Sequence, residues 1–431
     1  MSVHPDARAG DIVVASRQAA LARYRAVRLQ SEALCRPLAI EDYGVQSMAD
    51  VSPPKWHIAH MTWFFETFLL KPEQPGYRPF HPAYEYLFNS YYNAVGPQYP
   101  RPERGLLARP TVAQVYAYRR HVDETLARLI ERAPAAVWPR LAALLLLGIN
   151  HEQQHQELLL YDVKHNFAHN PLKPAYRHDL ARSNAEADGT GWHFFAGGVH
   201  AVGHGGEGFA FDNEGPRHEV LLGDFRLAGR LITIGEFFAF LEDGGYARPE
   251  LWLSDGWATV QREGWRAPLY WEAREGAWRI MTLGGERELN WDEPVCHVSY
   301  YEADAFARWR GKRLATEEEW EVAAEALPRE GNFVEADYLH PVPAGPGARR
   351  PAQMFGDLWE WTQSPYVPYR GYRAPAGAVG EYNGKFMSNQ MVLRGGSCAS
   401  PKDHIRASYR NFFYPHQRWM FAGIRLAEDV P

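Results

Sequence analysis

Long apolar segments with polar continuations indicate that the N-terminal part of the chain is helical. The apolar run 141–149 passes directly into the polar octet 150–157, Asn-His-Glu-Gln-Gln-His-Gln-Glu. The run contains no Pro, and its single Gly, Gly148, stands near its end. This pattern predicts a buried helix that continues through the octet. A second predicted helix opens with Trp56-His-Ile-Ala-His60 and continues through the apolar and aromatic-rich stretch 61–70.

Two further helices complete a predicted four-helix bundle. Residues 10 to about 40 alternate apolar and basic positions at helical spacing, which predicts an amphipathic first helix. Thr111 is a suitable N-cap for a helix that ends at about Glu131. A Pro- and Tyr-rich loop, 71–110, lies between. Helices with long connections favour an up-and-down bundle, which we expect over residues 10–185.

The pattern changes at about Gly191 to short alternating segments rich in Gly and Trp. Strands are predicted at 197–203, 218–222 and 392–396. Helices are predicted at 234–242, 299–309 and 316 to about 325, the last with Thr316 as its N-cap. We therefore predict an α+β protein in which a loop-rich second domain, 191–428, follows the helical bundle.

Composition and charge narrow the class of protein. With 431 residues, of which 46% are hydrophobic, the chain is long enough for two or three globular domains. A net charge of -6 without long charge runs argues against nucleic acid or an anionic membrane surface as partner. Cys35, Cys296 and Cys398 are odd in number and far apart, which suits a reducing compartment. The start carries no secretory signal, and no apolar stretch reaches the about 18 residues of a membrane span, so we expect a cytoplasmic protein.

The histidines of the polar octet are the first candidate for chemistry. His151 and His155 are four residues apart, which places both imidazoles on one face of a helix, as a divalent metal requires. Such a pair also occurs in helices without a metal. Burying so many polar groups beside a core costs several kcal/mol unless they are paired or ligated, which favours the metal. A third ligand is expected from His57 or His60, of which one can be an ordinary core histidine. We prefer His60.

Five motifs follow one another in a defined order in the second half of the chain. They span Asp292–Trp309, Arg313–Ala324, Phe355–Thr362, Leu393–Ser397 and Gly423–Leu426. This order resembles the formylglycine-generating-enzyme fold, which is related to C-type lectins. The first domain, with His-Glu-Gln-Gln-His at 151–155, resembles DinB-like four-helix bundles. Joined in this order, the two parts resemble the non-haem iron sulfoxide synthases of ergothioneine biosynthesis over nearly the whole chain.

The resemblance implies an iron- and dioxygen-dependent enzyme. That family joins a thiol to the imidazole C2 carbon of hercynine, trimethylhistidine, and oxygenates the sulfur. It implies that His60, His151 and His155 hold Fe(2+). Three neutral imidazoles leave three open positions, enough for the substrate imidazole, the thiolate sulfur and dioxygen. The ligand type alone does not exclude zinc.

The resemblance also implies how hercynine is bound. Gln154 and an Asn-aromatic pair, aligned with Asn411 and Phe412, correspond to the hercynine-binding residues of the family. An aromatic face is a natural partner for a quaternary ammonium, which forms no conventional hydrogen bond. The alternative is that Phe412 and Phe413 belong to the core.

The sulfur donor follows from two departures from the family pattern. Mycobacterial-type members carry an acidic residue and, four residues later, an Arg, where this chain has Phe413 and Gln417. The departures favour free cysteine over γ-glutamylcysteine as the second substrate. The arginines that could meet the substrate carboxylates are Arg78, Arg101, Arg104 and Arg418.

A tyrosine is expected to donate a proton during the oxygen chemistry. Tyr91 and Tyr92 match the paired tyrosines of the cysteine-using branch of the family. With a pKa near 10, a tyrosine stays neutral at pH 7 and can act as an acid. Adjacent tyrosines in a loop also serve packing, and Tyr366, Tyr369 and Tyr372 compete for the role.

Four alternatives to the cysteine-using hercynine enzyme remain. The same reaction could use γ-glutamylcysteine. Formylglycine generation needs a pair of cysteines for copper, and Cys398 has no partner downstream. Ovothiol-type synthases, which act on histidine, usually add a methyltransferase domain, whereas this chain ends at Pro431. The non-enzymatic alternative is a ligand-binding protein with a zinc-stapled bundle.

Overall fold

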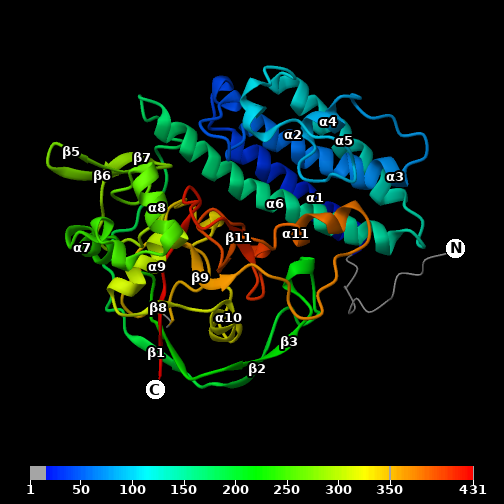
Figure 1. Cartoon of the computed structure of the whole chain (residues 1–431). Coiled ribbons are helices and arrows are strands. Elements are labelled where there is room, and N and C mark those ends of the chain that lie inside the picture. Colours follow the sequence, from blue (N-terminus) through cyan, green and yellow to red (C-terminus); the bar gives the residue numbers. More distant parts are fainter. Residues whose placement is uncertain (1–15, 349–350, 431) are drawn as a thin grey trace.

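The computed structural model describes residues 16–348 and 351–430 and consists of a helical bundle packed on a sheet-rich domain (Figure 1). The four long helices of the bundle are α1 (Arg17–Cys35), α2 (Pro54–Phe65), α5 (Val112–Arg132) and α6 (Trp138–His169). The predicted α+β class, with a four-helix bundle ahead of an irregular second domain, is confirmed. No helix in the described ranges has the length and apolar character needed to cross a membrane.

Helix α2 is the central helix of the bundle, and all of its residues are buried. It begins at Pro54, two residues before the predicted opening at Trp56, because Pro is well suited to the first turn of a helix. Regular α geometry ends at Phe65, and a π-helical segment, Glu66–Leu70, continues the helix into α3 (Lys71–Glu73). Such π segments are rare and often lie near functional sites.

The other bundle helices follow the predicted order. Of the predicted first helix, residues 10–15 lie outside the described residues, and α1 begins after its N-cap Ser16. Thr111 is confirmed as the N-cap of α5, since its side chain accepts a hydrogen bond from the Gln114 amide. The predicted loop 71–110 contains a short helix, α4 (Tyr84–Phe88), and a 3-10 turn. Helix α6 includes the octet and continues to His169.

Buried ion pairs fasten α6 to its neighbours in the bundle. The Glu152 carboxylate on α6 accepts hydrogen bonds from Arg28 on α1 (2.8 Å) and from Arg119 on α5 (2.7 Å). Ser31 donates a third hydrogen bond, at 2.6 Å. Burial alone would raise the pKa of Glu152, but the charges of Arg119 and Arg28 outweigh it and lower this pKa to about 2. Three helices are therefore fixed through one carboxylate.

The second domain is built from two four-stranded sheets and two smaller ones. The first sheet has the order β1 (Trp192–Phe195), β4 (Phe225–Ala228), β13 (Leu426–Asp429) and β8 (Arg313–Leu314). The second has the order β11 (Asn411–Phe413), β10 (Met391–Arg394), β9 (Trp359–Pro365) and β12 (Ala422–Gly423), with only β12 and β9 parallel. The smaller sheets are β2 (Gly198–Val202) with β3 (His218–Leu222), and β5 (Trp271–Arg274), β6 (Ala277–Thr282) and β7 (Gly285–Glu288).

Five helices accompany these sheets: α7 (Ile234–Glu242), α8 (Ser254–Glu263), α9 (Tyr300–Trp309), α10 (Glu317–Glu325) and α11 (Glu381–Gly384). The predictions of α7, α9 and α10 are confirmed, and Thr233, Ser299 and Thr316 cap them. The predicted strands correspond to β2, β3 and β10. Shorter 3-10 turns lie at Ile40–Gly44, Arg101–Leu106, Asp212–Glu214, Gly245–Ala247, Pro249–Leu251, Val334–Ala336, Ala378–Gly380 and Lys402–His404.

Helix α6 lies along the boundary between the bundle and the sheet-rich domain (Figure 1). Its Glu157 carboxylate accepts hydrogen bonds from Trp359 on β9 (2.8 Å) and from Ser400 (2.8 Å). Further along the helix, Asp162 accepts a hydrogen bond from the Trp419 indole, at 3.1 Å. One helix therefore belongs to the interior of both domains, and the candidate site lies on it.

Candidate metal centre

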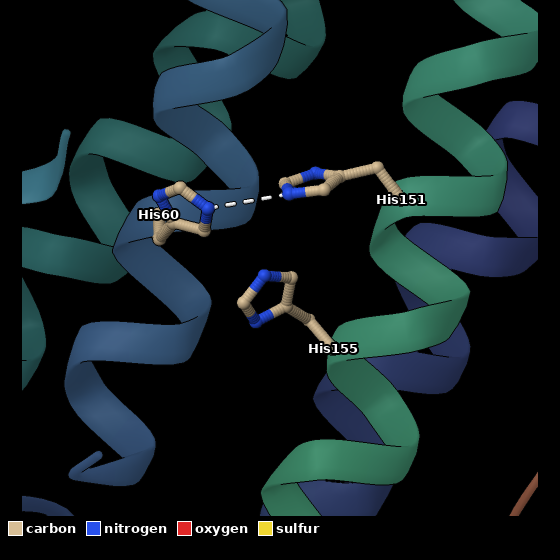
Figure 2. A group of neighbouring side chains, drawn as sticks. All are labelled: His60, His151 and His155. Carbon is tan, nitrogen blue, oxygen red and sulfur yellow. Dashed lines mark hydrogen bonds between the residues drawn. The ribbon is translucent and has the colours of Figure 1, made fainter. Parts of the chain in front are cut away.

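Three histidine side chains from two bundle helices point toward one another (Figure 2). His60 belongs to α2, and His151 and His155 belong to α6. One ring nitrogen from each lies within 4.8 Å of those of the other two, a spacing that suits a single metal ion. The closest pair is Nε2 of His60 and Nε2 of His151, 3.2 Å apart. A bound cation would take the lone pairs of both atoms.

Hydrogen bonds to the far side of two of these rings determine which nitrogen is available. Nδ1 of His60 lies 2.6 Å from the carbonyl oxygen of Phe88, so it must carry the proton. On the other side, Nε2 of His57 lies 2.9 Å from a carboxylate oxygen of Asp162 and donates to it. Nδ1 of His57 is then an acceptor for Nδ1 of His155, at 2.9 Å. Nε2 of both His60 and His155 is left with a free lone pair.

The three rings are neutral at neutral pH. Burial lowers the pKa of His60 and of His155 well below the ordinary value, and it lowers the pKa of His151 to about 4. Nδ1 of His151 is buried and has no hydrogen-bond partner in the described part of the chain. Three neutral imidazoles can bind a divalent cation without first losing a proton.

Aromatic neighbours hold the rings in place. The indole rings of Trp56 and Trp63 stack on His60, with centroids 4.6 and 5.4 Å away. Phe64 stacks on His151, with centroids 4.6 Å apart. Locked rotamers of this kind keep ligands in place before a metal arrives.

A cavity of about 320 Å³ opens beside His60 and His155, and both domains line it. We call it the substrate cavity. Of the residues singled out in the sequence, it is lined by Tyr91, Arg101, Arg104, Gln154, Asn411, Phe412, Phe413 and Gln417. Residues far apart in the chain therefore meet at one place.

The residues from the second domain reach the substrate cavity through β11. Asn411 and Phe412 lie on this strand, which is paired with β10 so that Phe412 is opposite Val392. The ring of Phe412 stacks on Tyr366, with centroids 4.1 Å apart. Phe412 and Phe413 are only partly buried, because they face the cavity. From the bundle side, the Gln154 amide donates to the hydroxyl of Tyr409, at 2.8 Å.

The four candidate arginines separate into two groups. Arg418 forms an ion pair with Glu302 at 3.0 Å, stacks on Trp265 and does not line the substrate cavity. Arg78 is exposed. Arg101 and Arg104 do line the cavity, one turn apart.

Arg104 is a buried cation without a counter-ion. Its guanidinium donates to the hydroxyls of Ser52 and Ser90, each at 2.9 Å, and lies over the Trp56 ring. No carboxylate in the described residues pairs with it. Burial, together with the charge of Arg101, lowers the pKa of Arg104 to about 9. An unpaired buried charge is costly, so this site is suited to receive an anion.

The candidate tyrosines occupy different positions. Tyr91 lines the substrate cavity, and its hydroxyl accepts a hydrogen bond from Arg101. Tyr92 is buried against Trp63 and stacks on Tyr382 of α11, with centroids 6.0 Å apart. The competing hydroxyls of Tyr366, Tyr369 and Tyr372 are hydrogen-bonded to Asn213, Glu317 and Asp212.

Tyr382 is a site residue that was not among the candidates from the sequence. It lines the substrate cavity and also a second cavity beside His151. In the sequence, Tyr382 is one of several tyrosines in the segment that follows the Trp-Glu-Trp-Thr motif, and no pattern distinguishes it from the others.

Comparisons with known proteins agree with this arrangement. Residues 23–159 match the DinB superfamily, and residues 178–351 and 350–430 match the sulfatase-modifying factor enzyme 1-like domain. A hercynine oxygenase of Mycobacterium tuberculosis is 33% identical over 407 residues, which cover 88% of this chain and 92% of the relative. The chain belongs to the hercynine oxygenase family. A hercynine oxygenase of Mycolicibacterium smegmatis is likewise 33% identical, over 88% of this chain and 92% of its own length.

Membership of the hercynine oxygenase family makes the protein an oxygenase and confirms the resemblance found in the sequence. A formylglycine-generating enzyme of Streptomyces coelicolor is 28% identical and covers only 54% of this chain. In the described residues, the one cluster with the spacing of a metal site is the histidine trio, and no cysteine contributes to it.

We predict that His57 supports metal binding by orienting His155. Replacing His57 with Phe removes the acceptor of the Nδ1 proton of His155 but leaves the trio intact. Loss of such an outer partner typically costs about 10–100-fold in metal affinity. Competition with a metal-binding dye should show this loss, with the exposed His178→Phe as matched control. An unchanged affinity in a folded His57→Phe protein would contradict the prediction.

Proposed function

We propose that the protein is an iron(II)-dependent hercynine oxygenase of ergothioneine biosynthesis that acts in the cytoplasm. It would join C2 of the hercynine imidazole to the sulfur of cysteine and oxygenate that sulfur with dioxygen. The observation that carries the proposal is the trio of buried, neutral imidazoles at the end of a cavity that both domains line. Relatives named hercynine oxygenase that align over most of the chain support it.

The donor set fits iron(II). His60, His151 and His155 offer three neutral nitrogens from one side, which would leave an iron ion its full charge and open positions for reactants. Bound iron would supply the coordination positions that dioxygen and the thiolate need, and it would pass electrons from the two substrates to dioxygen. Zinc should bind to the same donors at least as tightly, so the metal has to be tested directly.

Hercynine carries a trimethylammonium group that the aromatic side of the substrate cavity suits. Phe412 offers a partly exposed ring, fixed by its stacking on Tyr366. An aromatic face attracts a quaternary ammonium through its quadrupole, by about 0.5–2 kcal/mol. The amides of Gln154 and Asn411, which line the same cavity, would orient the imidazole and the charged groups of hercynine.

Cysteine is the favoured sulfur donor because the cavity provides positive charge for one small carboxylate. Arg104 lacks a counter-ion, and Arg101 lies beside it with Tyr91 as partner. Phe413 and Gln417, which also line the cavity, bring no charge for the additional groups of γ-glutamylcysteine. We therefore assign the cysteine carboxylate to the two arginines.

The candidate proton donors are three tyrosines that line the two cavities beside the histidine trio, Tyr91, Tyr92 and Tyr382. Burial raises the pKa of Tyr92 and of Tyr382 above the ordinary value, so both keep their hydroxyl protons at neutral pH. Their rings stack where the two cavities adjoin. Tyr91, whose hydroxyl is bonded to Arg101, is better placed to position the cysteine carboxylate. We infer that Tyr382 or Tyr92 delivers the proton.

We predict that the iron-loaded protein forms one sulfoxide product per dioxygen from hercynine and cysteine. In this balance the imidazole C2–H and the thiol S–H are lost, a C–S bond and an S=O bond form, and the second oxygen atom leaves as water. Oxygen consumption measures the dioxygen used, and mass spectrometry measures the sulfoxide formed. His155→Ala should lose iron and activity, whereas His178→Ala should keep both. Tight zinc binding without oxygen consumption would favour the ligand-binding alternative.

The same assay separates the neighbouring activities. Because Arg101 and Arg104 offer charge for one carboxylate, kcat/KM for cysteine should exceed that for γ-glutamylcysteine by about tenfold or more, which corresponds to about 1.4 kcal/mol. Histidine lacks the trimethylammonium group and should be the poorer partner. A preference for histidine would point to an ovothiol-type enzyme, and a preference for γ-glutamylcysteine would overturn the choice of cysteine.

We predict that Arg104→Gln raises KM for cysteine by about 10–100-fold, since a hydrogen bond between charged groups contributes about 1.5–3 kcal/mol. The free enzyme should become no less stable, because the substitution removes a buried charge that has no counter-ion. Steady-state kinetics and thermal unfolding measure the two effects, with exposed Arg109→Gln as control. A loss of stability with unchanged KM would give Arg104 a structural role instead.

We predict that Tyr382→Phe or Tyr92→Phe slows sulfoxide formation and diverts oxygen to the thiol alone, giving cysteine sulfinate. General acid catalysis typically contributes about 100-fold or more, so the product ratio should change clearly. Tyr91→Phe should instead mainly raise KM for cysteine. Chromatography of both products checks this. Unchanged ratios in both variants would exclude these two tyrosines as the acid.

A further inference from the structure

A second cavity, of about 500 Å³, lies beside His151. We call it the apolar cavity. Most of its lining is apolar and consists of Phe64, Ala143, Leu144, Leu146, Leu147, Phe209, Ala210, Phe211, Pro375 and Val379. Its polar lining consists of Tyr92, His151, Gln154, His204, Asp212, Tyr382 and Asn383. The substrate cavity is lined by His60 and His155, whereas the apolar cavity is lined by the third member of the trio. The two cavities therefore approach the proposed metal position from different sides.

The apolar run that precedes the histidine octet supplies one wall of this cavity. Leu141, Leu145 and Ile149 are almost fully buried, as the sequence predicted for the whole run. Leu144 and Leu147 are only partly buried, because they face the apolar cavity. The run therefore serves two surfaces, the bundle core and the cavity. Leu144 and Leu147 have no part in the binding of hercynine or cysteine argued above.

We propose that the apolar cavity is the route by which dioxygen reaches the metal site, an inference that rests on the proposed function. Dioxygen is small, uncharged and apolar. Cavities lined by Leu and Phe stay dry and take up apolar guests such as xenon. Hercynine and cysteine are zwitterions, whose charges would lose their hydration among these side chains.

The contacts at the inner end of the cavity support this assignment. Phe64, which stacks on His151, lines the cavity, as does His151 itself. Tyr92 and Tyr382 line it as well, and they are the proposed proton donors. A molecule that arrives by this route therefore reaches His151 and the hydroxyls of Tyr92 and Tyr382 without crossing the substrate cavity.

Separate access would also allow dioxygen to bind after the two amino-acid substrates. The substrate cavity is small, at about 320 Å³, and two amino-acid substrates would occupy much of it. Gln154, Phe211, Tyr382 and Asn383 line both cavities and stand between them. With these residues in place, dioxygen can reach the trio after hercynine and cysteine have bound.

Filling the apolar cavity tests the route kinetically. Leu147→Trp places an indole in the cavity one turn before His151, and Ala143→Phe fills it a further turn away. Both should raise KM for dioxygen by about three- to tenfold and leave KM for hercynine and cysteine within about twofold, because only the binding path of the gas changes. Exposed Leu172→Trp is the matched control and should match the wild type. Iron content of each variant identifies any damage to the trio.

Xenon binding tests the cavity without turnover. Crystals pressurised with xenon should show the gas between Leu147 and Phe209 in the wild type and not in Leu147→Trp. Absence of xenon from the wild-type cavity, or an unchanged KM for dioxygen in both iron-loaded variants, would overturn the route alone. A wild type that consumes no dioxygen with hercynine and cysteine would overturn the proposed function, and this inference with it.

Discussion

The polar face of α6 is buried between two domains, and each of its charged groups must find a partner there. Glu152 turns toward the bundle, to Arg28 and Arg119, while Glu157 turns toward the second domain, to Trp359 and a pair of serines. A buried carboxylate without such partners would cost several kcal/mol. The rotation of α6 about its axis is therefore determined by both domains together.

This constraint decides where the histidines point. His151 directly precedes Glu152, and His155 lies between the two glutamates in sequence, so fixing both carboxylates leaves the imidazoles facing α2 and His60. Among the three histidines, His155 is linked to the second domain by a chain of hydrogen bonds. His155 is bonded to His57, His57 to Asp162, and Asp162 to the Trp419 indole. Docking of the second domain thus helps to orient a candidate ligand through two intervening side chains.

Local signals in the sequence sufficed for much of the fold. Caps such as Thr111, Thr233 and Ser299 act within one helical turn, so their side chains specify helix starts without help from the rest of the chain. The spacing of His151 and His155 is local in the same sense. Helix α8 and the sheet β5–β7 were not predicted, and α8 follows Leu253, which offers no side-chain cap, so no local signal of this kind marks its start.

The parts of the site that could not be predicted from the sequence depend on contacts between residues far apart in the chain. His57 and His60 could not be told apart by spacing, because Asp162, which holds His57, lies 105 positions further along the chain. Arg104 and Arg418 look alike in sequence. They differ because Glu302 forms an ion pair with Arg418, whereas no carboxylate in the described chain forms an ion pair with Arg104.

The two cavities divide the reactants by polarity, and the same helix makes this division possible. The N-terminal turns of α6 are apolar and line the apolar cavity, and its middle turns are polar and line the substrate cavity. The two histidines of α6 lie where its apolar turns pass into its polar turns. An uncharged gas and two charged amino acids can then approach one metal ion along surfaces that each suit them. The change from Leu to His and Gln along a single helix therefore gives each cavity a wall of matching polarity.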